Sequence, residues 1–360
     1  MHIGIYTPYL DTFGGGERYL LTVGEILSQE NAVDLLIDAH LKNLNPEKLK
    51  IDLSERLNLD LSRVSLVDAP VGKGASLKKR VTFLKKYDFL FFITDGSLFY
   101  STAKKSILHI QTPLINKGIQ NIKNRIYLSS WDLIIYNSKF TKKNVEKYWP
   151  KKSIVIYPPV DTASIKPLKK EKYILSVGRF FGYLREKKHE TMIKSFIELI
   201  DNKKINNWSL NLVGSASEGD KPYVEELKQM SKGYPINFYP NLPFQDLIKL
   251  YGQSSIYWHA MGFGENEPTK MEHFGITTVE AMAGGCVPVV INKGGQKEIV
   301  KHGKSGFLWN DLNQLQEITL RLAKDKDLFK TLSKEAQIRS ELFSKENFKQ
   351  NINKIINESY

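Results

Sequence analysis

The chain has 360 residues, of which 41% are hydrophobic and 25% are charged, and it carries a formal net charge of +13. This composition supports the cores of about two globular domains and excludes a disordered, collagen-like or low-complexity protein. No apolar run approaches the ~18 residues of a transmembrane helix, and the only cysteine, Cys286, cannot form an internal disulfide. We therefore expect a cytoplasmic protein. We also expect no signal peptide, because the first residues lack a basic segment followed by a long apolar one.

The first half of the chain predicts alternating strands and helices. Helical patterns occupy residues 16–29 and 138–148. Several apolar runs around them do not alternate with polar residues, which is typical of parallel strands covered by helices on both faces. The predicted strands are residues 3–6, 33–39, 64–67, 89–93, 107–110, 133–136 and 154–157.

A basic segment interrupts this pattern at residues 71–87, which contain no acidic residue. Leu77, Val81 and Leu84 recur there at helical spacing and predict a short basic amphipathic helix. Such a helix either presents a solvated lysine face or contacts an anionic membrane, and both interpretations stay open. Its cations are Lys73, Lys78, Lys79, Arg80, Lys85 and Lys86.

A break follows at Pro158 and Pro159, because two prolines remove strand hydrogen bonds, and the polar residues 166–172 suit a linker. A second series of strands and helices then begins, and the tail from residue 335 to residue 360 is predicted to be helical. The strands of this second series are residues 174–177, 210–213, 236–239, 256–258 and 287–291, and its helices are residues 188–199, 222–230, 244–251 and 277–283.

These two series predict an α/β fold with two doubly wound, Rossmann-like domains. We place the first domain at residues 1–165 and the second at residues 166–340, with a C-terminal helix 341–360 that packs back on the first domain. Ligands of such sheets bind at the carboxyl ends of the strands, so we expect the site in a cleft between the two domains.

Three glycines, Gly14 to Gly16, lie between the first predicted strand and the first helix. Glycines at this place let backbone N–H groups approach an anion at the helix N-terminus. The pattern is not a dinucleotide-binding fingerprint, because Tyr19 stands where a third glycine would be needed. The cluster favours a phosphate-binding loop, with a simple tight turn as the alternative.

The second domain opens with a strand that ends at Gly178 and Arg179, and Lys187 and Lys188 follow before a helix. A guanidinium at the strand end and an ammonium a few residues later can both bind one diphosphate. The alternative is that these residues are ordinary surface charges.

Residues 272–285 carry the strongest pattern. Residues 274–277 would begin a helix, and its unpaired N–H groups and dipole favour an anion. Glu272 precedes this helix and Glu280 lies inside it, and two carboxylates at these places suit sugar or ribose hydroxyls. The neighbours of Glu280 are core-type residues, so we expect it to be buried with a partner, for which a ligand is a natural candidate.

This segment resembles the Glu-x7-Glu signature of the retaining nucleotide-sugar glycosyltransferases of family 4, the glycosyl transferases group 1, which have the GT-B fold. The resemblance extends over much of the chain, and the order and spacing of its segments make it specific. The other matching segments are residues 13–18, residues 177–179 with the downstream lysine, and residues 258–260, 294–300 and 303–308.

The resemblance implies a role for each matching residue. Arg179 and Lys187 would hold the donor diphosphate, with Lys188 as the alternative to Lys187. Glu280 would bind the ribose, and Glu272 would face the donor sugar. The remaining donor-binding residues implied by the resemblance are Gly15, Gly16, Phe274, Gly275, Ile276 and Thr277.

His109, at the end of a predicted strand, matches the family's active-site histidine near the transferred sugar, although a histidine there is often structural. Trp258 and His259 end another strand near the same cleft and are either base-packing or core residues. The catalytic residues implied by the resemblance are thus His109, Glu272, Arg179 and Lys187.

We expect no metal and no other cofactor. The only Asp-x-Asp triplet, Asp325 to Asp327, lies in a lysine-rich polar stretch and is interpreted as a helix cap or surface feature. The expected partners are a GDP- or UDP-linked sugar, a glycan or lipid-linked acceptor, and an anionic membrane surface that residues Lys73–Lys86 would contact at the inner face. Nucleic acid is not expected, since basic residues are not interleaved with aromatic ones.

The resulting hypothesis is a retaining, metal-independent hexosyltransferase. Mannose is favoured, because the Gly-Gly-Gly-Glu-Arg sequence at residues 14–18 resembles mannosyltransferases that act on lipid-linked sugars. The alternative is a nucleotide-sugar-binding protein without catalytic activity.

Overall fold

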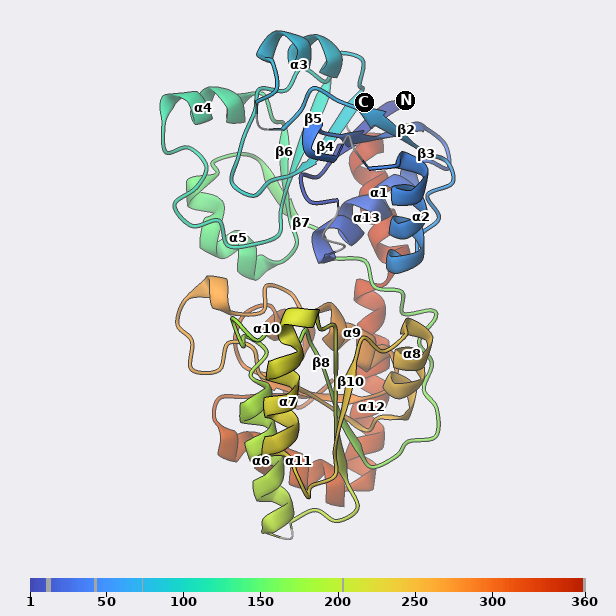
Figure 1. Ribbon diagram of the computed structural model, residues 1–360, viewed down its shortest axis with the longest axis vertical. Helices are drawn as coiled ribbons and strands as arrows, with labels where there is room; N and C mark the ends of the chain where they lie inside the picture. Colours follow the sequence, from blue (N-terminus) through green and yellow to red (C-terminus); the bar gives the residue numbers. More distant parts are fainter. Residues whose placement is uncertain (11–13, 42–43, 73, 203, 359–360) are drawn as a thin grey trace. The chain divides into compact units, whose positions relative to one another are not determined.

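The computed structural model of the chain (Figure 1) describes residues 1–10, 14–41, 44–72, 74–202 and 204–358. The chain folds as two compact units: an N-terminal unit, Met1–Pro159 with Phe348–Tyr360, and a C-terminal unit, Val160–Asn347. Each unit contains one parallel sheet with helices on its faces, which confirms the predicted α/β class. In the described part of the chain, no helix combines the length and the apolar character that crossing a bilayer requires.

The sheet of the N-terminal unit has seven described strands, in the order β3-β2-β1-β4-β5-β6-β7, and all neighbours are parallel. Every strand predicted for the first half is present, shifted by at most two residues. The strands are β1 (His2–Tyr6), β2 (Ala32–Ile37), β3 (Val64–Asp68), β4 (Phe89–Ile93), β5 (Lys105–Ile110), β6 (Leu133–Tyr136) and β7 (Ser153–Val155).

Both faces of this sheet are buried, which explains why the strand sequences do not alternate. Ile3 and Ile5 of β1 pack into one apolar core, and Tyr6 packs into a second core on the other face. The helices of the unit are α1 (Gly15–Leu27), α2 (Pro46–Leu57), α3 (Leu77–Leu84), α4 (Ile122–Ser129) and α5 (Lys139–Val145). Neither α2 nor α4 was predicted from the sequence.

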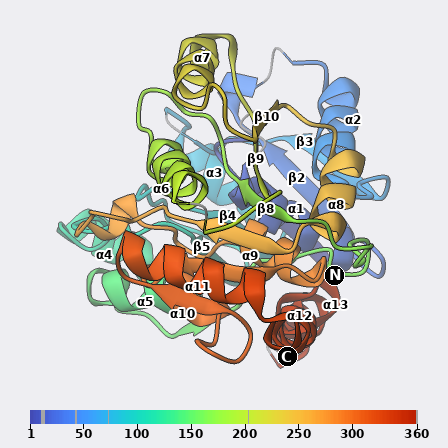
Figure 2. The ribbon, with the colours of Figure 1, turned by 90° about the horizontal axis from the view of Figure 1, so that it is seen from below.

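The C-terminal helix α13 (Lys345–Glu358) belongs to the core of the N-terminal unit (Figure 2). Phe348 meets the ring of Tyr19 edge-on, with the ring centroids 4.9 Å apart. Ile352 and Ile356 are buried in the same apolar core as Ile3. The last helix therefore returns to the unit in which the chain began.

The sheet of the C-terminal unit has six described strands in the order β10-β9-β8-β11-β12-β13, again all parallel. Helices α6, α7 and α11 cover one face, and α8, α9 and α12 cover the other (Figures 1 and 2). The strands are β8 (Tyr173–Val177), β9 (Ser209–Gly214), β10 (Ile236–Pro240), β11 (Ile256–His259), β12 (Val287–Ile291) and β13 (Phe307–Trp309). The helices are α6 (His189–Asp201), α7 (Lys221–Met230), α8 (Phe244–Gln253), α9 (Ile276–Ala283), α10 (Gln296–Ile299), α11 (Leu312–Lys324) and α12 (Lys326–Ser340).

The tail predicted to be helical, residues 335–360, is helical in the part that the structure describes, and it consists of two helices. Helix α12 ends at Ser340, a short 3₁₀ turn follows, and α13 begins at Lys345. Ser344 has an extended backbone, and its hydroxyl accepts a hydrogen bond from the backbone N–H of Asn347 at 3.2 Å. A serine at such a place ends one helical segment and caps the next.

Candidate functional site

At the carboxyl end of β8, the side chain of a lysine packs across a glycine. β8 ends at Val177, and the side chain of Lys187 crosses the next residue, Gly178. A Cβ atom at residue 178 would lie only 2.8 Å from Cγ of Lys187. Glycine at this position therefore lets the lysine stem cross the strand end toward neighbouring strands.

Lys187, Glu272 and His259 form a compact polar cluster at this edge. Nζ of Lys187 lies 2.6 Å from Oε2 of Glu272, and Nε2 of His259 lies 3.0 Å from the same oxygen. Met261 lies beside them, with its Sδ 3.3 Å from Nζ of Lys187. The Lys187 and Glu272 side chains keep 23% and 19% of their surface exposed, so the ion pair is open to a ligand.

Electrostatics fix the protonation state of this cluster. Burial acts to raise the pKa of Glu272, but Lys187 and His259 together lower it well below its usual range. Burial lowers the pKa of His259, so the ring is neutral at neutral pH and donates from Nε2 to the carboxylate. The cluster thus combines one carboxylate, one ammonium and one neutral imidazole.

Helix α9 begins next to Glu272. Gly275 precedes the helix with φ +119°, and the first N–H groups of α9 have no partner from a preceding turn of the helix. Thr277 in this first turn shares a hydrogen bond of 2.7 Å with the hydroxyl of Tyr257 from β11. The predicted residues Phe274, Gly275, Ile276 and Thr277 therefore do form the approach to a helix N-terminus.

Two glycines hold the loop before α9. The backbone N–H of Gly295 donates to the carbonyl of Glu272 at 2.8 Å. Gly294 has φ +60°, and a Cβ atom there would overlap the same carbonyl. The glycine pair 294–295 is needed because the two backbones approach too closely for any side chain.

Glu280 is buried in α9, as predicted from its neighbours, with 4% of its surface exposed. Its Oε2 accepts a hydrogen bond of 2.9 Å from the hydroxyl of Tyr251 in α8. Burial is the main cause that raises the pKa of Tyr251 well above 10, so this phenol stays a donor. From the sequence, a ligand was expected to be the partner of Glu280. The hydroxyl of Tyr251 instead supplies one partner from within the protein.

The other two predicted cations lie outside the Lys187–Glu272–His259 cluster. Lys188 caps α6 with φ +59°, and its Nζ pairs with Glu265 at 2.6 Å. Arg179 is exposed, and among the described residues no hydrogen bond or ion pair joins it to Glu272. Of the two lysines considered for the diphosphate, the structure brings Lys187 to Glu272.

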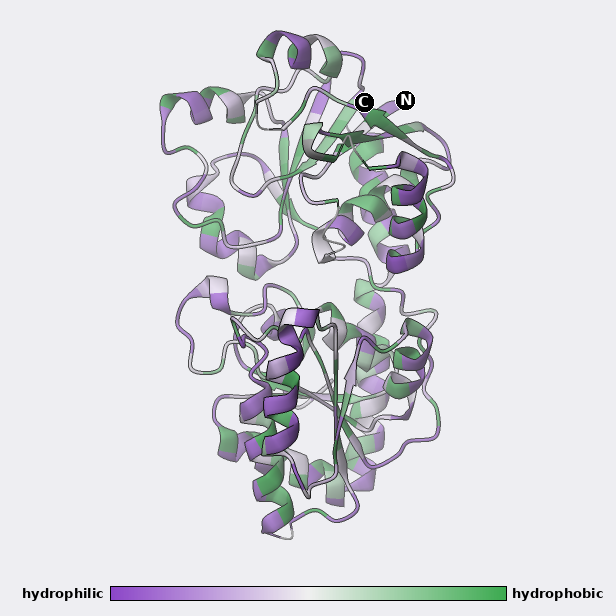
Figure 3. Cartoon of the chain, viewed as in Figure 1, coloured by the Kyte–Doolittle hydropathy of each residue, from purple (hydrophilic) through white to green (hydrophobic). Residues whose placement is uncertain are grey.

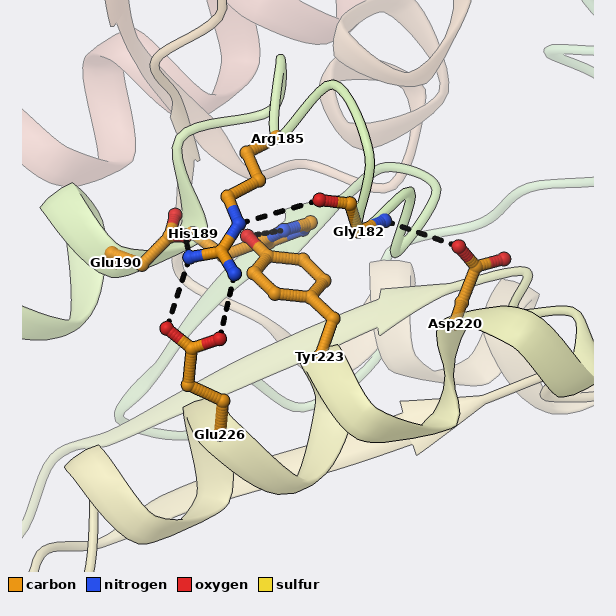
Figure 4. A network of polar contacts seen from close by, with 7 residues as sticks. All are labelled: Gly182, Arg185, His189, Glu190, Asp220, Tyr223 and Glu226. Atoms are coloured by element: carbon orange, nitrogen blue, oxygen red, sulfur yellow. Dashed lines mark hydrogen bonds and ion pairs between the residues drawn. The ribbon is translucent and has the colours of Figure 1, made fainter.

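Figure 4 shows what holds the loop between Arg179 and Lys187. Arg185 forms two hydrogen bonds with Glu226 of α7, at 2.9 and 2.7 Å, and a third with Glu190 of α6 at 3.2 Å. The N–H of Gly182 donates to Asp220 at 3.1 Å. Since these partners belong to regular elements, the loop is fixed and Lys187 is positioned by it. The sequence analysis missed this network.

The N-terminal unit presents a different edge around Gly14 to Gly16. Gly14 caps α1, and its N–H donates to the carboxylate of Glu17 at 2.9 Å. The other oxygen of Glu17 accepts from the hydroxyl of Thr7 at 3.2 Å, at the end of β1. A side chain at Gly16 would overlap the amide of Gln111 from the loop after β5. Phe13, the first residue of the predicted glycine loop, lies outside the described residues.

His109 of β5 is buried rather than at an open edge, with 2% of its surface exposed. Its ring stacks on Tyr19, with centroids 3.9 Å apart. Burial lowers the pKa of His109 to about 3, against a small opposing effect of the Ile135 backbone, so the ring is neutral. Within the described residues, neither ring nitrogen has a hydrogen bond of normal geometry.

The predicted Asp-x-Asp triplet has a structural role at its first residue. Asp325 is the N-cap of α12, and its carboxylate accepts a hydrogen bond of 2.9 Å from the N–H of Leu328. This agrees with its interpretation as a helix cap.

Residues 161–339 match the family model described as Glycosyl transferases group 1. These residues are therefore a glycosyl transferases group 1 domain. The matched residues contain the Lys187–Glu272–His259 cluster, α9 and Glu280. The predicted assignment to the glycosyltransferases is thereby confirmed at the level of the family.

Among curated proteins, the chain is 29% identical to the GDP-Man:Man(3)GlcNAc(2)-PP-Dol alpha-1,2-mannosyltransferase of Dictyostelium discoideum over 255 residues, which is 63% of this chain and 48% of that protein. It is 31% identical to the protein of the same name from Xenopus tropicalis over 195 residues, 49% of this chain and 38% of that one. It is also 25% identical to Alpha-1,3/1,6-mannosyltransferase ALG2 of Candida glabrata over 301 residues, 70% of this chain and 64% of that one. The chain spans less than half the length of the first two relatives.

Solved glycosyltransferase structures share the fold over the whole chain. The structure of Anabaena Alr3699/HepE in complex with UDP and glucose gives a TM-score of 0.70 at 20% identity, covering 99% of this chain and all of that one. Sucrose-phosphate synthase from Thermosynechococcus elongatus gives a TM-score of 0.73 at 16% identity, covering 99% of this chain and 98% of that one. The predicted GT-B fold is thus confirmed.

Proposed function

We propose that this glycosyl transferases group 1 protein moves a hexose, with mannose favoured, from a nucleoside-diphosphate sugar to a hydroxyl of a glycan or lipid-linked acceptor, with retention of configuration. The observation that carries the proposal is the Lys187–Glu272–His259 cluster beside the N-terminus of α9. An ammonium and unpaired helix N–H groups suit a diphosphate, while the carboxylate suits sugar hydroxyls.

The cluster offers a way to bind an anion without leaving a buried charge unpaired. In the structure Glu272 neutralises Lys187 at 2.6 Å. A diphosphate that approached Nζ would share this ammonium with the carboxylate, and Glu272 would turn one oxygen to a donor-sugar hydroxyl. Because His259 also binds Glu272 at 3.0 Å, the carboxylate stays in place during this exchange.

The chemical step follows from these groups. The bond between the anomeric carbon and the diphosphate oxygen breaks, and the carbon gains oxocarbenium character. Lys187, Arg179 and the N–H groups of α9 stabilise the departing diphosphate, which is why the proposal requires no metal. The acceptor hydroxyl attacks from the face that the diphosphate leaves and gives its proton to a phosphate oxygen.

The other predicted residues complete the proposal. Glu280 would bind the ribose, held by Tyr251 at 2.9 Å. From the N-terminal unit, Gly15 and Gly16 would cover the phosphates, and His109 would lie near the transferred sugar. Because burial lowers the pKa of His109 to about 3, the ring is a weak base, and we assign it to binding and not to general base catalysis.

Two sets of similar proteins bear on the donor. The relatives from Dictyostelium discoideum and Xenopus tropicalis are named for GDP-Man, and the Anabaena structures contain UDP, UDP-glucose or UDP with glucose. The donor is therefore proposed to be a GDP- or UDP-linked sugar, with GDP-mannose favoured. The relatives' names also support a lipid-linked acceptor, so the proposal keeps the predicted contact of residues 73–86 with the inner face of an anionic membrane; Lys73 itself lies outside the described residues.

The test is a panel of GDP-mannose, GDP-glucose, UDP-glucose and UDP-N-acetylglucosamine, each measured for hydrolysis and for transfer to a lipid-linked oligosaccharide. Transfer from GDP-mannose in the presence of a chelator, with an α-linked product by the C1–H1 coupling constant, is the expected result. A β-linked product contradicts retention, and a loss of transfer on chelation contradicts metal independence. Binding of a donor without hydrolysis or transfer would favour the alternative of an inactive nucleotide-sugar-binding protein.

A further inference from the structure

The positive charge of the chain is concentrated in one part of the N-terminal unit. Residues 69–131 contain eleven lysines and arginines but only two acids, Asp88 and Asp95, so they hold +9 of the net charge of +13. This stretch contains α3, α4 and the segment that joins β4 to β5. A charge imbalance of this size on one region favours an anionic partner.

Helix α4 combines these cations with exposed aliphatic side chains. Ile122 and Ile126 are 77% and 53% exposed, and their spacing of four residues places them on one side of the helix. Lys123 and Arg125 between them are exposed as well, while Leu128 packs into the core. Figure 3 shows hydrophobic and hydrophilic residues mixed along α4. Two isoleucines on one exposed helical face are unusual unless something covers them.

Helix α3 lies where the basic amphipathic helix was predicted, and it contributes more charge than apolar surface to the exterior. Leu84 is fully buried in the unit's core, so only Leu77, at 54%, remains an exposed apolar residue. Arg80 is buried too, with its guanidinium 5.2 Å from the ring centroid of Phe99. Lys78 and Lys79 are exposed.

The two helices are joined into one region by the segment between β4 and β5. The hydroxyl of Thr102 donates to the carbonyl of Val81 in α3 at 2.6 Å, and the N–H of Ser101 donates to the hydroxyl of Ser130, the C-cap of α4, at 2.9 Å. Arg80 of α3 also interacts electrostatically with Tyr127 of α4. The segment between β4 and β5 thus contacts both helices, and their exposed side chains are here named the α3–α4 face: Lys78, Lys79, Ile122, Lys123, Arg125 and Ile126.

We propose that the α3–α4 face docks on an anionic lipid bilayer, with Ile122 and Ile126 entering the headgroup region and the four cations contacting lipid phosphates. The charge of residues 69–131 complements such a surface. Aliphatic side chains flanked by lysine and arginine suit the boundary between headgroups and acyl chains. The inference deepens the proposed function, because a bilayer would present a lipid-linked acceptor, but the docking itself requires neither donor nor acceptor.

The test is flotation of the full chain with vesicles of phosphatidylcholine alone and of phosphatidylcholine with 30% phosphatidylglycerol, about the anionic content of a charged leaflet. We expect at least about tenfold tighter binding to the anionic vesicles, with most of it lost at about 0.5 M salt, where surface charges are screened. Equal binding to both vesicles overturns the proposal. A second pair of results also overturns the proposal: an excess of a soluble polyanion such as heparin abolishes vesicle binding in salt-matched samples, and replacing Ile122 and Ile126 has no effect on binding.

Matched variants locate the surface. The double variant Ile122→Ser with Ile126→Ser should bind anionic vesicles at least about tenfold more weakly, and Lys78→Gln with Lys79→Gln about 25-fold more weakly, at about fivefold per cation. The controls replace exposed residues of the same types elsewhere: Ile51→Ser with Ile338→Ser, which are 55% and 56% exposed, and Lys330→Gln with Lys334→Gln on α12. Controls that lose binding as strongly as the α3–α4 variants would overturn the assignment.

Donor hydrolysis without vesicles separates this inference from the proposed function. None of the four variants alters a residue assigned to the donor, so all should hydrolyse the donor at the wild-type rate, which also reports that they are folded. A wild-type chain that neither binds nor hydrolyses any donor contradicts the transferase proposal and leaves the flotation result to decide the docking proposal.

Discussion

The carboxyl edges of the two sheets are built on opposite principles. At the edge of the C-terminal unit, charged side chains meet: Lys187 and Glu272 form an ion pair of 2.6 Å next to the start of α9. At the edge of the N-terminal unit, His109 is buried and neutral, and Glu17 accepts hydrogen bonds from the Gly14 N–H and from the hydroxyl of Thr7 at the end of β1. The two sheets are similar, but their carboxyl edges differ. The edge of the C-terminal unit presents charged side chains to a ligand, and the edge of the N-terminal unit presents closely packed backbone and neutral side chains.

The largest effect expected from this comparison is the loss of charge at the C-terminal edge. Lys187→Gln keeps a hydrogen-bonding group beside Glu272 but removes the ammonium. We expect kcat/KM for transfer to fall by about 10²–10³-fold, the usual cost of removing one group that stabilises developing negative charge.

Lys188→Gln is the matched control, since Lys188 pairs with Glu265 and not with Glu272. It should change kcat/KM by less than about threefold, because the pair of Lys188 with Glu265 lies outside the Lys187–Glu272–His259 cluster. Steady-state kinetics with GDP-mannose measure both variants, and thermal unfolding checks that both are folded. A larger loss in the Lys188 variant would assign the diphosphate to that lysine instead.

The second effect concerns the loop that holds Glu272. Gly294→Ala places a methyl group against the carbonyl of Glu272 at φ +60°, so the loop must move. A shift of about 1 Å in a positioned catalytic group costs about 10²-fold in rate, and we expect transfer to fall by that order.

The variant Gly303→Ala tests the effect of backbone strain alone, without the steric clash that Gly294→Ala also introduces. Gly303 has a similar φ of +72°, but within the described residues a methyl group there would meet nothing within 4 Å. It should cost about 1–2 kcal/mol of stability and leave the transfer rate almost unchanged. Equal losses of transfer in the two alanine variants would show that the approach of Gly294 to Glu272 is unimportant for activity.

The sequence predicted those site residues of the two edges that lie within short, recognisable segments. Strand ends, the glycines at 178 and 294–295, and the pair Glu272 and Glu280 all follow from short segments, and the structure places them at the expected strand and helix ends. The contacts of Tyr251 with Glu280 and of Arg185 with Glu226 join residues 29 and 41 positions apart, and no local pattern indicates them.

Helix α4 was missed for a different physical reason. Helical periodicity in a sequence reveals a buried stripe, but α4 buries only Leu128 among its eight residues and exposes Ile122 and Ile126. Its apolar residues therefore do not mark a core-facing side. The same property that hides the helix from sequence patterns makes its surface a candidate for docking.

A third, smaller effect separates binding from packing at Glu280. Glu280→Gln keeps the shape but removes the charge that would accept ribose hydroxyls. Donor affinity should fall by about 10–100-fold, because hydrogen bonds to a charged group contribute about 1.5–3 kcal/mol. Isothermal calorimetry with the nucleoside diphosphate gives the dissociation constant directly.

Tyr251→Phe removes the partner of Glu280 and keeps its carboxylate, since the hydroxyl of Tyr251 lies 2.9 Å from Oε2. We expect a loss of donor affinity below about fivefold, because only the orientation of the carboxylate changes. If Tyr251→Phe weakens donor binding as much as Glu280→Gln does, the carboxylate serves the packing of α8 on α9 and not the ribose.

The smallest effect is a pH dependence shared by both units. His109 in the N-terminal unit and His189 in the C-terminal unit are buried, and burial lowers the pKa of each to about 3. In the unfolded chain each would have a pKa of about 6.5, so between pH 6.5 and 3 the unfolded state binds more protons than the folded state. Stability is therefore fully present above pH 6.5 and decreases as the pH falls. Each histidine should contribute a loss of about 2 kcal/mol between pH 6.0 and 4.5.

Urea unfolding at these two pH values, compared between the wild type and His109→Gln, measures the contribution of His109. The variant should lose about 2 kcal/mol less than the wild type over the same interval. The pH profile of the transfer rate is a second measurement on the same variant. Because His109 is neutral between pH 5 and 8, it contributes no inflection to the profile there. His109→Gln should therefore lower the rate without changing the shape of the profile. An inflection near pH 7 that disappears in His109→Gln would mean that this histidine does carry a proton during transfer, and that the N-terminal edge supplies charge after all.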